Sequence, residues 1–375
     1  MPSERRYLVL VNAIHARAGG GITYLRNLLP LLAAEDDLDI HLIPHPSQAD
    51  SLAALSPLIR VHCLAMPKNW LPLILWEQLM LPLLAARIGY DVVFSPANFG
   101  PIFLPAQVVV VQNAVSVAAS EHRVGKKFYW GALRTMTALS LLFTRRAIAV
   151  SQYAADSSAA PFPSTAPVII HHGVSAMFSP APIASPRRAF LLAVGDLYIQ
   201  KNLHRLIEAL PLVRRQHPEI VLNIAGDEVD ADYAATLSRL VVALGLTDAV
   251  TFLGRRHGTE LVELYRCCAA FVFPSTIESF GMPLVEAMAC GAPVIASNTA
   301  AIPEIAGDAA LLCNPEDPHD IAEKIICVLD DSVLRQSLRD RGIVRAQAFS
   351  WQECAGRTAD VLRDAVANKT LLVRA

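Results

Sequence analysis

The feature that most constrains this chain is a repeated alternation of short apolar runs with longer helical runs. Apolar runs such as Tyr7–Asn12 and Ile220–Ala225 are each followed by a segment whose apolar residues recur at helical spacing. This alternation predicts mostly parallel sheets covered by helices on both faces. The Pro-rich stretch Phe178–Arg188 interrupts the series and is predicted to be a linker.

A chain of 375 residues is also too long for one core. The sequence therefore predicts two doubly wound α/β domains facing a cleft, because ligands in such sheets bind beyond the carboxyl ends of the strands. The predicted parts are an N-terminal domain over 1–180, a second domain over 188–349, and an amphipathic C-terminal helix over 350–375 that begins at a Ser350 cap.

Charge and cysteine content restrict the class of protein. The net charge of −2 argues against a general nucleic-acid binder. The seven cysteines show no CxxC spacing, which predicts reduced core residues in a cytoplasmic protein and no zinc site. The apolar window Trp70–Ile88 is interrupted by Glu77 and Gln78, so no transmembrane helix is expected. The N-terminus lacks the small-residue cleavage site of a signal peptide.

The segment Pro274–Ser297 is the strongest candidate for a ligand site. It places two glutamates, Glu278 and Glu286, eight positions apart around a predicted helix start at Pro283. Gly291 is predicted to end this helix, and a short strand follows. A loop with backbone N–H groups and two carboxylates suits a ligand that carries both phosphate and hydroxyl groups.

Two further strand ends in the second half are predicted to lie at the same edge of the sheet. Lys201 follows the first strand and can bring a point charge to a phosphate. Gly226 follows the second strand and permits close backbone approach to a ligand. Alone, each has an ordinary interpretation, as a solvated lysine and as a turn glycine. Together with the two glutamates they favour a site for phosphate and sugar.

The N-terminal half offers weaker signals. Gly19–Gly21 stand between a strand and a predicted helix over Ile22–Ala34, and they fit a phosphate-binding loop or a flexible connection equally well. A predicted helix over Glu121–Arg146 carries six basic residues against Glu121 alone. A solvated helix face is the favoured interpretation, and docking to anionic lipid headgroups or a lipid diphosphate is the alternative.

The second half resembles the nucleotide-sugar-binding domain of retaining glycosyltransferases of the family 4, or group 1, type, which have the GT-B fold of two Rossmann-like domains. The resemblance covers roughly Leu191–Trp351 and rests on VGDLYIQKNLHRLIEAL, LNIAGDE, FLGRR, LYRCCAAFVFPSTIESFGMPLVEAMACGAPVIAS and IPEIAGDAALLCNP. The first half is similar to the acceptor domain of that family more loosely, through GGGITYLRNLL, WEQLMLP, FSPANFGP, AVSQYAADS and HHGVSAMFSP.

The resemblance implies a role for each motif residue. Glu286 would bind the ribose hydroxyls, Glu278 would face the donor hexose, and Lys201 would neutralise charge on the leaving diphosphate. Gly20 and Gly21 would close on that diphosphate from the other domain, and the C-terminal helix would cross back to the first domain. Backbone N–H groups of one short stretch would hold sugar hydroxyls and the diphosphate: Phe280, Gly281, Met282, Pro283 and Leu284.

This sequence departs from the family pattern at two places. Asp196 stands where the family usually has an arginine, and Arg255 or Arg256 could supply the missing charge. Gln112 and Asn113 stand where many members have His-Asp, which leaves no charged general base there and fits proton transfer to the leaving phosphate itself. A third pattern, the D-x-D of Asp37 and Asp39, lies at a turn and is interpreted as structural, with no metal site expected.

These observations predict a retaining, metal-independent glycosyltransferase without a cofactor. The resemblance alone implies the donor: the enzyme would move a hexosyl unit, mannose as the first choice, from GDP-mannose or a UDP-hexose to a hydroxyl acceptor. The expected acceptor is a glycan or a polyprenyl-linked oligosaccharide of cell-surface polysaccharide synthesis, with a location in the cytoplasm or at the inner face of the membrane. Two alternatives remain. One is a sugar-nucleotide epimerase of the same fold. The other is a degenerate nucleotide-sugar-binding subunit, which is suggested by the departures from the family pattern at Asp196 and Gln112.

Overall fold

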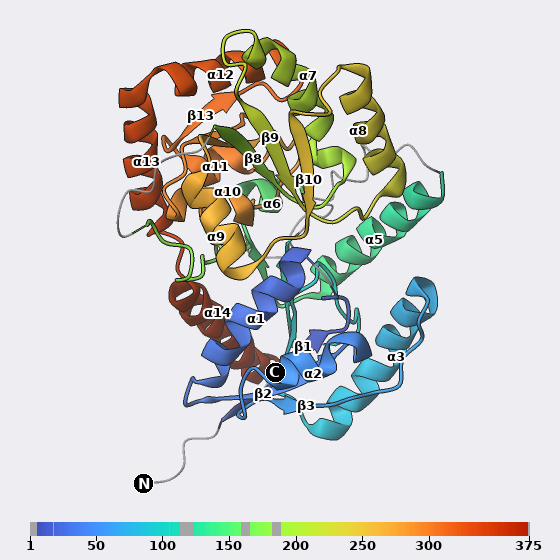
Figure 1. Cartoon of the computed structure of the whole chain (residues 1–375). Coiled ribbons are helices and arrows are strands. Elements are labelled where there is room, and N and C mark those ends of the chain that lie inside the picture. Colours follow the sequence, from blue (N-terminus) through green and yellow to red (C-terminus); the bar gives the residue numbers. More distant parts are fainter. Residues whose placement is uncertain are drawn as a thin grey trace. The chain divides into compact units, whose positions relative to one another are not determined.

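The computed structural model describes residues 6–17, 19–104, 106–112, 124–158, 166–181 and 189–373, with the backbone alone for 124–130 and 368–373. The chain divides into two compact units. The first contains Met1–Gly173 and Trp351–Ala375, and the second contains Val174–Ser350. Each unit is described by itself (Figure 1).

The first unit is built on a parallel sheet in the order β3-β2-β1-β4-β5-β6-β7. Its strands are β1 Tyr7–Ala13, β2 Leu38–Pro44, β3 Arg60–Val61, β4 Val92–Ser95, β5 Gln107–Val111, β6 Arg146–Ala149 and β7 Val168–Ile169. Its helices are α1 Gly19–Ala33, η1 Pro46–Gln48, α2 Ala49–Ala53, α3 Trp70–Ile88, α5 Val124–Phe143, α6 Gln152–Asp156 and α14 Trp351–Val373.

The second unit has a parallel sheet in the order β10-β9-β8-β11-β12-β13. Its strands are β8 Phe190–Val194, β9 Val221–Ala225, β10 Val250–Gly254, β11 Ala270–Phe273, β12 Val294–Ser297 and β13 Ala310–Cys313. Its helices are η2 Ile199–Lys201, α7 Leu203–Arg214, α8 Ala231–Ala243, α9 Gly258–Cys267, α10 Met282–Ala289, α11 Ile302–Ala306, α12 Pro318–Asp330 and α13 Ser332–Ala346.

Both sheets reverse their strand order once. The reversal lies between β1 and β4 in the first unit and between β8 and β11 in the second. The strands are apolar and buried along most of their length, as in Val93, Val109 and Phe271, because helices cover both faces. In sheets of this kind the crevice beyond the carboxyl ends of the strands at the reversal is the usual place for a ligand.

The boundary between the units falls ahead of the predicted linker. The N–H of Val174 donates to the carbonyl of Phe349, and Arg266 donates to the carbonyl and hydroxyl oxygens of Ser179. These bonds attach the first part of the Phe178–Arg188 stretch to the second unit. The unit therefore begins at Val174, and residues 182–188 lie outside the described structure.

Two predicted helices have different bounds in the structure. The glycines expected as a loop before Ile22 form the first turn of α1, which begins at Gly19. The basic helix expected over Glu121–Arg146 is α5, which ends at Phe143. Arg145 and Arg146 lie beyond it and hold α14, since Arg145 donates to the carbonyl of Ala365 and Arg146 pairs with Asp364.

The C-terminal helix α14 packs within the first unit. It contacts α1 and the strands β1, β4, β5 and β6. Its first residue, Trp351, lies beside the buried His172 and Tyr24 at ring-centroid distances of 5.8 and 6.0 Å. Gly173, where the chain leaves this unit, lies against Trp351, where the chain returns to it. A side chain at position 173 would collide with the backbone of Trp351, so the close approach requires glycine.

Helix α3 differs from the expectation of no transmembrane segment. By length and composition alone it could cross a membrane, and it is the one helix of the described chain that could. Its middle residue Glu77 is nevertheless fully buried, and Leu73, Leu81 and Ala85 pack into a core cluster with Leu10 of β1. One face of α3 therefore belongs to the interior of the first unit.

Candidate functional site

The candidate site of the second unit lies at the reversal of its sheet. Lys201 follows β8 and Glu278 follows β11, the two strands that meet at the reversal. The Nζ atom of Lys201 donates to Oε1 of Glu278 at 2.6 Å, and the two side chains are 18% and 15% exposed. Lys201 and Glu278, the two residues predicted from the sequence to be catalytic, are thus in direct contact.

Two neighbours give Lys201 its position. A side chain at Gly195 would come within 3.0 Å of the Lys201 stem, so the glycine makes room for the lysine to pass. The ammonium lies 5.4 Å from the centre of the Phe273 ring at the end of β11, a distance typical of a cation–π contact. The lysine is therefore held within the site, unlike a solvated loop lysine.

Asn202 connects three loops of this edge. It stands at the start of α7, where its side chain makes no cap bond. Its amide instead donates to the carbonyls of Pro274 and Pro315, at 3.1 and 2.7 Å, from a buried position with a left-handed backbone. Asn and Gly are the residues that adopt this backbone most easily, so Asn202 fixes the loop of Lys201 to the loop that leads to Glu278.

The start of α10 supplies fewer backbone donors than predicted. Pro283 has no N–H, and the N–H of Leu284 donates to the carbonyl of Gly281 at 2.9 Å. Pro283 therefore cannot act as a backbone donor, and the predicted role of Leu284 stays a prediction although its N–H has an acceptor within the turn. Gly281 adopts a φ of 88° against the ring of Phe273, which aims the chain into the helix. The N–H groups of Gly281 and Met282 remain as candidates for an anion.

Glu286 lies one helical turn further along α10 and has a partner that the sequence did not indicate. The hydroxyl of Tyr265, a fully buried residue of α9, donates to Oε2 of Glu286 at 3.1 Å. Burial raises the pKa of the Glu286 carboxyl to about 7, and the Tyr265 hydrogen bond lowers it in part. One carboxyl oxygen is thus held by the protein, and the other can meet a ligand hydroxyl.

Gly226 has a packing reason of its own. A side chain there would lie 2.0 Å from the carbonyl oxygen of Gly195, so the glycine lets the ends of β8 and β9 approach each other. This contact explains the glycine without a ligand. Its predicted role in donor binding stays a prediction.

Arg255, one of the two candidates for the missing cation, lies beside Asp196. Arg255 follows β10, and its guanidinium lies 2.7 Å from a carboxylate oxygen of Asp227 and 3.6 Å from one of Asp196. Asp196 also accepts from the N–H of Asp227. Arg256, the other candidate, pairs weakly with Glu260 at 4.0 Å. Arg255 therefore reaches the edge of the sheet at which Lys201 stands.

The predicted residues of the first unit gather at the carboxyl edge of its own sheet. Gly20 and Gly21 lie in the first turn of α1, where N–H groups lack intrahelical acceptors. A side chain at Gly21 would meet Oε1 of Gln112, the residue that follows β5. The N–H of Gln112 donates to Oδ1 of Asn98 at 2.8 Å. Asn113 lies outside the described residues.

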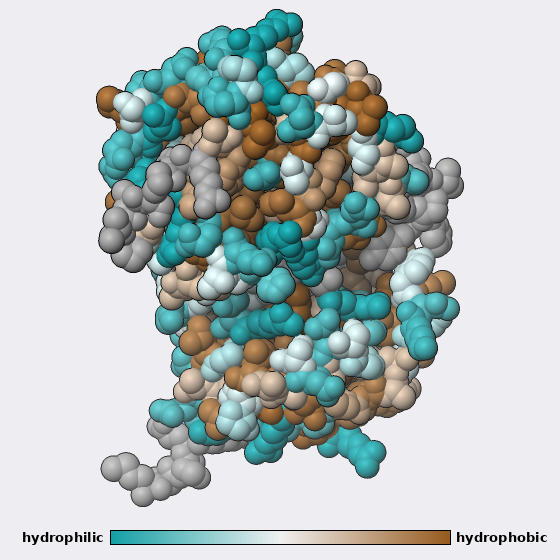
Figure 2. Space-filling model, viewed as in Figure 1, coloured by the Kyte–Doolittle hydropathy of each residue, from teal (hydrophilic) through white to brown (hydrophobic). Residues whose placement is uncertain are grey.

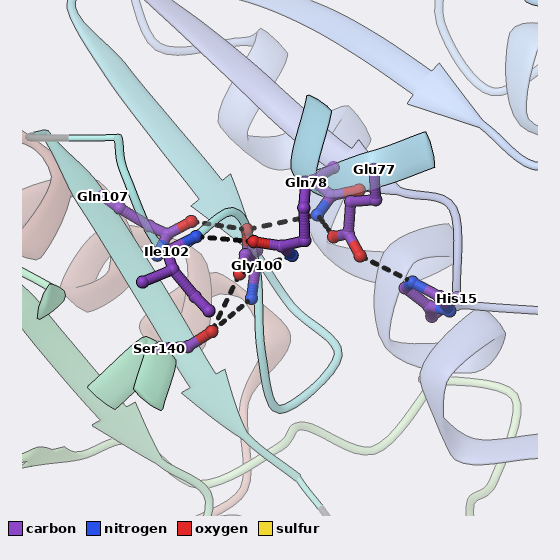
Figure 3. A network of polar contacts seen from close by, with 9 residues as sticks. His15, Glu77, Gln78, Gly100, Ile102, Gln107 and Ser140 are labelled. Carbon is purple, nitrogen blue, oxygen red and sulfur yellow. Dashed lines mark hydrogen bonds and ion pairs between the residues drawn. The ribbon is translucent and has the colours of Figure 1, made fainter. Parts of the chain in front are cut away.

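A buried polar network beside this edge was not predicted. Glu77 of α3 accepts from the amide of Asn12 and pairs with Nε2 of His15 at 2.9 Å, and His15 follows β1 (Figure 3). The ring of His15 also lies 4.7 Å from that of Phe99. The sequence offered one signal, a charged residue inside an apolar helix, which was interpreted as an interruption of a membrane span.

The D-x-D pattern has protein partners. Arg363 of α14 donates to both carboxylate oxygens of Asp37 at 2.8 Å and to Glu35 at 2.7 Å. Asp39 faces His41 and Arg60 at 3.5 and 3.6 Å. The structural interpretation of these two aspartates agrees with these contacts. Within the described ranges, histidine, cysteine and carboxylate side chains form no group of three or more that could hold a metal ion.

Comparison with solved structures defines the class of fold. Sucrose-phosphate synthase (tll1590) from Thermosynechococcus elongatus matches with a TM-score of 0.77 at 19% identity, over 97% of this chain and all of that chain. Anabaena Alr3699/HepE in complex with UDP and glucose matches with a TM-score of 0.77 at 18% identity, over 96% and 100%. The two parallel α/β units thus have the GT-B fold, as the sequence predicted.

Comparison of sequences shows what the second unit is similar to. Residues 179–345 match the family model "Glycosyl transferases group 1". O-antigen chain mannosyltransferase B of Escherichia coli is 33% identical over 180 residues, which are 47% of this chain and 46% of that protein. Glycogen synthase of Mycobacterium tuberculosis H37Rv is 35% identical over 198 residues, 52% and 47% of the two chains. The chain spans about half the length of the curated relatives it matches.

Proposed function

We propose that the protein is a glycosyltransferase that moves a hexosyl unit from a nucleotide diphosphate sugar to a hydroxyl acceptor, with retention at the transferred carbon. The observation that carries the proposal is the contact of Lys201 with Glu278 at the sheet reversal, beside the start of α10, within the residues that match the group 1 family model. A cation, a carboxylate and backbone donors at one edge suit a diphosphate joined to a sugar.

In the proposed reaction the bond between the sugar carbon and the diphosphate oxygen breaks, and a bond to the acceptor oxygen forms. The acceptor proton passes to an oxygen of the leaving phosphate, so no protein base is required. Lys201 and the N–H groups of Gly281 and Met282 stabilise the charge on the diphosphate, and Arg255 adds a second cation. Glu278 faces the hexose, and the outer oxygen of Glu286 accepts from the ribose.

The proposed donor is GDP-mannose, with a UDP-hexose as the second choice. The names of two curated relatives, O-antigen chain mannosyltransferase B and serotype-specific mannosyltransferase WbdA, support mannose and a glycan acceptor. A solved neighbour in complex with UDP-glucose supports the second choice. We further propose a polyprenyl-linked or glycan acceptor of cell-surface polysaccharide synthesis, a cytoplasmic or inner-membrane location, and chemistry without a resident metal or cofactor.

The test is donor turnover with and without an acceptor, measured on the wild-type chain and on Lys201→Ala. We expect turnover to need the acceptor and to fall by about 100-fold in the variant, with donor affinity changed far less, because the lysine acts on charge that develops in the transition state. Lys324→Ala, which removes a surface lysine paired with Asp320 and Glu323 in the same unit, is the matched control and should keep wild-type turnover.

The same assay separates the alternatives. Conversion of the donor to an isomer without an acceptor would identify an epimerase. Donor binding without any turnover would identify a degenerate binding subunit. Wild-type turnover in Lys201→Ala would exclude this lysine as the group that holds the diphosphate.

A further inference from the structure

The first unit exposes a stripe of leucines along α3. Leu71, Leu75, Leu79 and Leu83 are 48%, 57%, 64% and 64% exposed. Residues four apart rotate by about 40° around a helix, so the four side chains fall within a sector of about 120°. The buried residues Leu73, Glu77 and Leu81 lie on the opposite side. Exposed apolar side chains arranged in this way mark an interaction surface.

Two phenylalanines of the first unit are also exposed. Phe103, in the loop before β5, is 79% exposed, and its ring lies 6.4 Å from that of Phe143, which is 54% exposed at the end of α5. Together with the four leucines, Phe103 and Phe143 are called the apolar platform below. In Figure 2, brown residues lie among paler ones over the part of the first unit where Figure 1 shows α3.

Hydrogen bonds fix the three segments of the platform to one another. Gln78 of α3 accepts from the N–H of Ile102 at 2.9 Å and donates to the carbonyl of Gly100 (Figure 3). Ser140 of α5 accepts from the N–H of Gly100 at 3.1 Å and donates to its carbonyl at 2.8 Å. The loop that carries Phe103 is thus bonded to both helices, and the platform is a preformed surface.

Charge around α3 favours an anionic partner. Lys68 and Arg87, both exposed, stand near its two ends, and Trp70 begins the helix. Between them the only acidic residue is Glu77, which is buried. Tryptophan, lysine and arginine at the ends of an apolar segment are typical of a membrane–water interface. A second copy of the chain fits less well, because facing α3 helices would bring like charges together in either direction.

We infer that the apolar platform docks the protein on the surface of an anionic lipid bilayer, with α3 lying in the plane of the membrane. Leucine and phenylalanine side chains enter the headgroup–acyl boundary, while Lys68 and Arg87 meet the anionic headgroups. The helix does not span the bilayer, because Glu77 pairs with His15 and Asn12, and Leu73 and Leu81 pack in the core. This inference does not depend on the proposed activity.

The test is flotation of the full-length chain with vesicles of phosphatidylethanolamine and phosphatidylglycerol at roughly 3:1, and with phosphatidylcholine vesicles alone. We expect stronger binding to the anionic vesicles. Leu75→Gln/Leu79→Gln should weaken that binding by about tenfold or more, because burial of apolar side chains drives insertion. Phe103→Ser, on a loop, tests the same platform without any change in a helix.

The matched control is Val242→Gln/Val344→Gln, which removes two apolar side chains that are each 67% exposed on helices of the second unit. It should bind vesicles as the wild type does. Failure of the wild type to float with anionic vesicles would overturn the inference, as would unchanged binding of both platform variants. A wild-type dimer in light scattering that Phe103→Ser splits, with no vesicle binding, would assign the platform to a second copy.

Discussion

At the scale of single residues, several side chains near the candidate site have structural partners. Tyr265 holds one oxygen of Glu286, and the carbonyl of Gly195 explains why position 226 is a glycine. Asn202 uses its amide to tie loops together instead of capping a helix. A role of such a residue in ligand binding therefore has to be tested by a measurement that would not change if the residue only stabilised the fold.

The pH dependence of donor binding is such a property for Glu286. Burial raises the pKa of this carboxyl from 4.5 to about 7, so the free protein holds a proton there below neutral pH. Ribose hydroxyls donate hydrogen bonds and favour the ionised form, so binding below pH 7 releases this proton. We expect the affinity for GDP-mannose, measured by calorimetry, to rise about tenfold per pH unit up to pH 7 and then level off.

Glu286→Gln is the control, because it keeps the shape of the side chain and cannot titrate. Its affinity should be independent of pH over the same range. The raised pKa also predicts that this group stabilises the free protein fully below about pH 4.5 and that this contribution is lost as the pH rises through 7. A wild-type affinity that does not change between pH 5.5 and 8 would remove the ribose role.

Residue roles were less predictable from the sequence than residue positions. Lys201, Glu278 and Arg255 could be placed at one edge, because parallel strands bring their carboxyl ends together. The partners of Glu286 and Asn202 could not, since Tyr265, Pro274 and Pro315 come from other elements and only the tertiary packing selects them. The bond from the N–H of Leu284 to the carbonyl of Gly281, which closes the first turn of α10, could not be predicted from the sequence either.

At the scale of elements, the strands and helices of both sheets follow from apolar periodicity, and their ends follow from local contacts. α1 begins at Gly19 because the glycines can continue into the helix, and α5 ends at Phe143, ahead of Arg145 and Arg146. The sequence also did not show which face of α3 is buried in the protein. Its composition resembles that of a membrane span, whereas Glu77, His15 and Asn12 fix one side of it in the protein.

The attachment of α14 gives a prediction at this scale. Arg363 bonds Asp37 and Glu35, and its bond to Asp37 lowers the pKa of that carboxyl. We expect Arg363→Met to reduce the free energy of unfolding by about 1 kcal/mol at pH 7, a value discounted for partial exposure. Arg357→Met is the control, because Arg357 faces Glu353 on the same helix at 4.0 Å, and it should have almost no effect.

The sign of the pH dependence checks the assignment. A lowered pKa in the folded state means that Asp37 stabilises the protein above its unfolded value of 3.8 and that this contribution is lost as the pH falls through the folded value. The difference between wild type and Arg363→Met should therefore shrink in strongly acidic buffer. An equal effect of the two methionine substitutions in chemical denaturation at pH 7 would show that the Arg363 contacts do not stabilise the fold.

At the scale of the whole molecule, the chain returns to its first unit after completing the second. Residues 351–375 belong to the unit that the chain leaves at Gly173. Each unit carries polar residues at the carboxyl edge of its own sheet, Lys201 and Glu278 in the second unit, and His15 and Gln112 in the first. In the proposed function, Lys201 and Glu278 of the second unit bind the donor. The first unit presents the apolar platform.

We propose that the second unit binds a nucleotide diphosphate sugar at the edge formed by Lys201, Glu278 and Glu286. The most direct measurement is isothermal titration of the full chain with GDP-mannose and UDP-glucose, repeated on Glu286→Ala. We expect one donor site per chain and an affinity at least about tenfold weaker in the variant, because a buried hydrogen bond to a charged group is lost. Absence of binding by both donors, or the same affinity in Glu286→Ala, would contradict it.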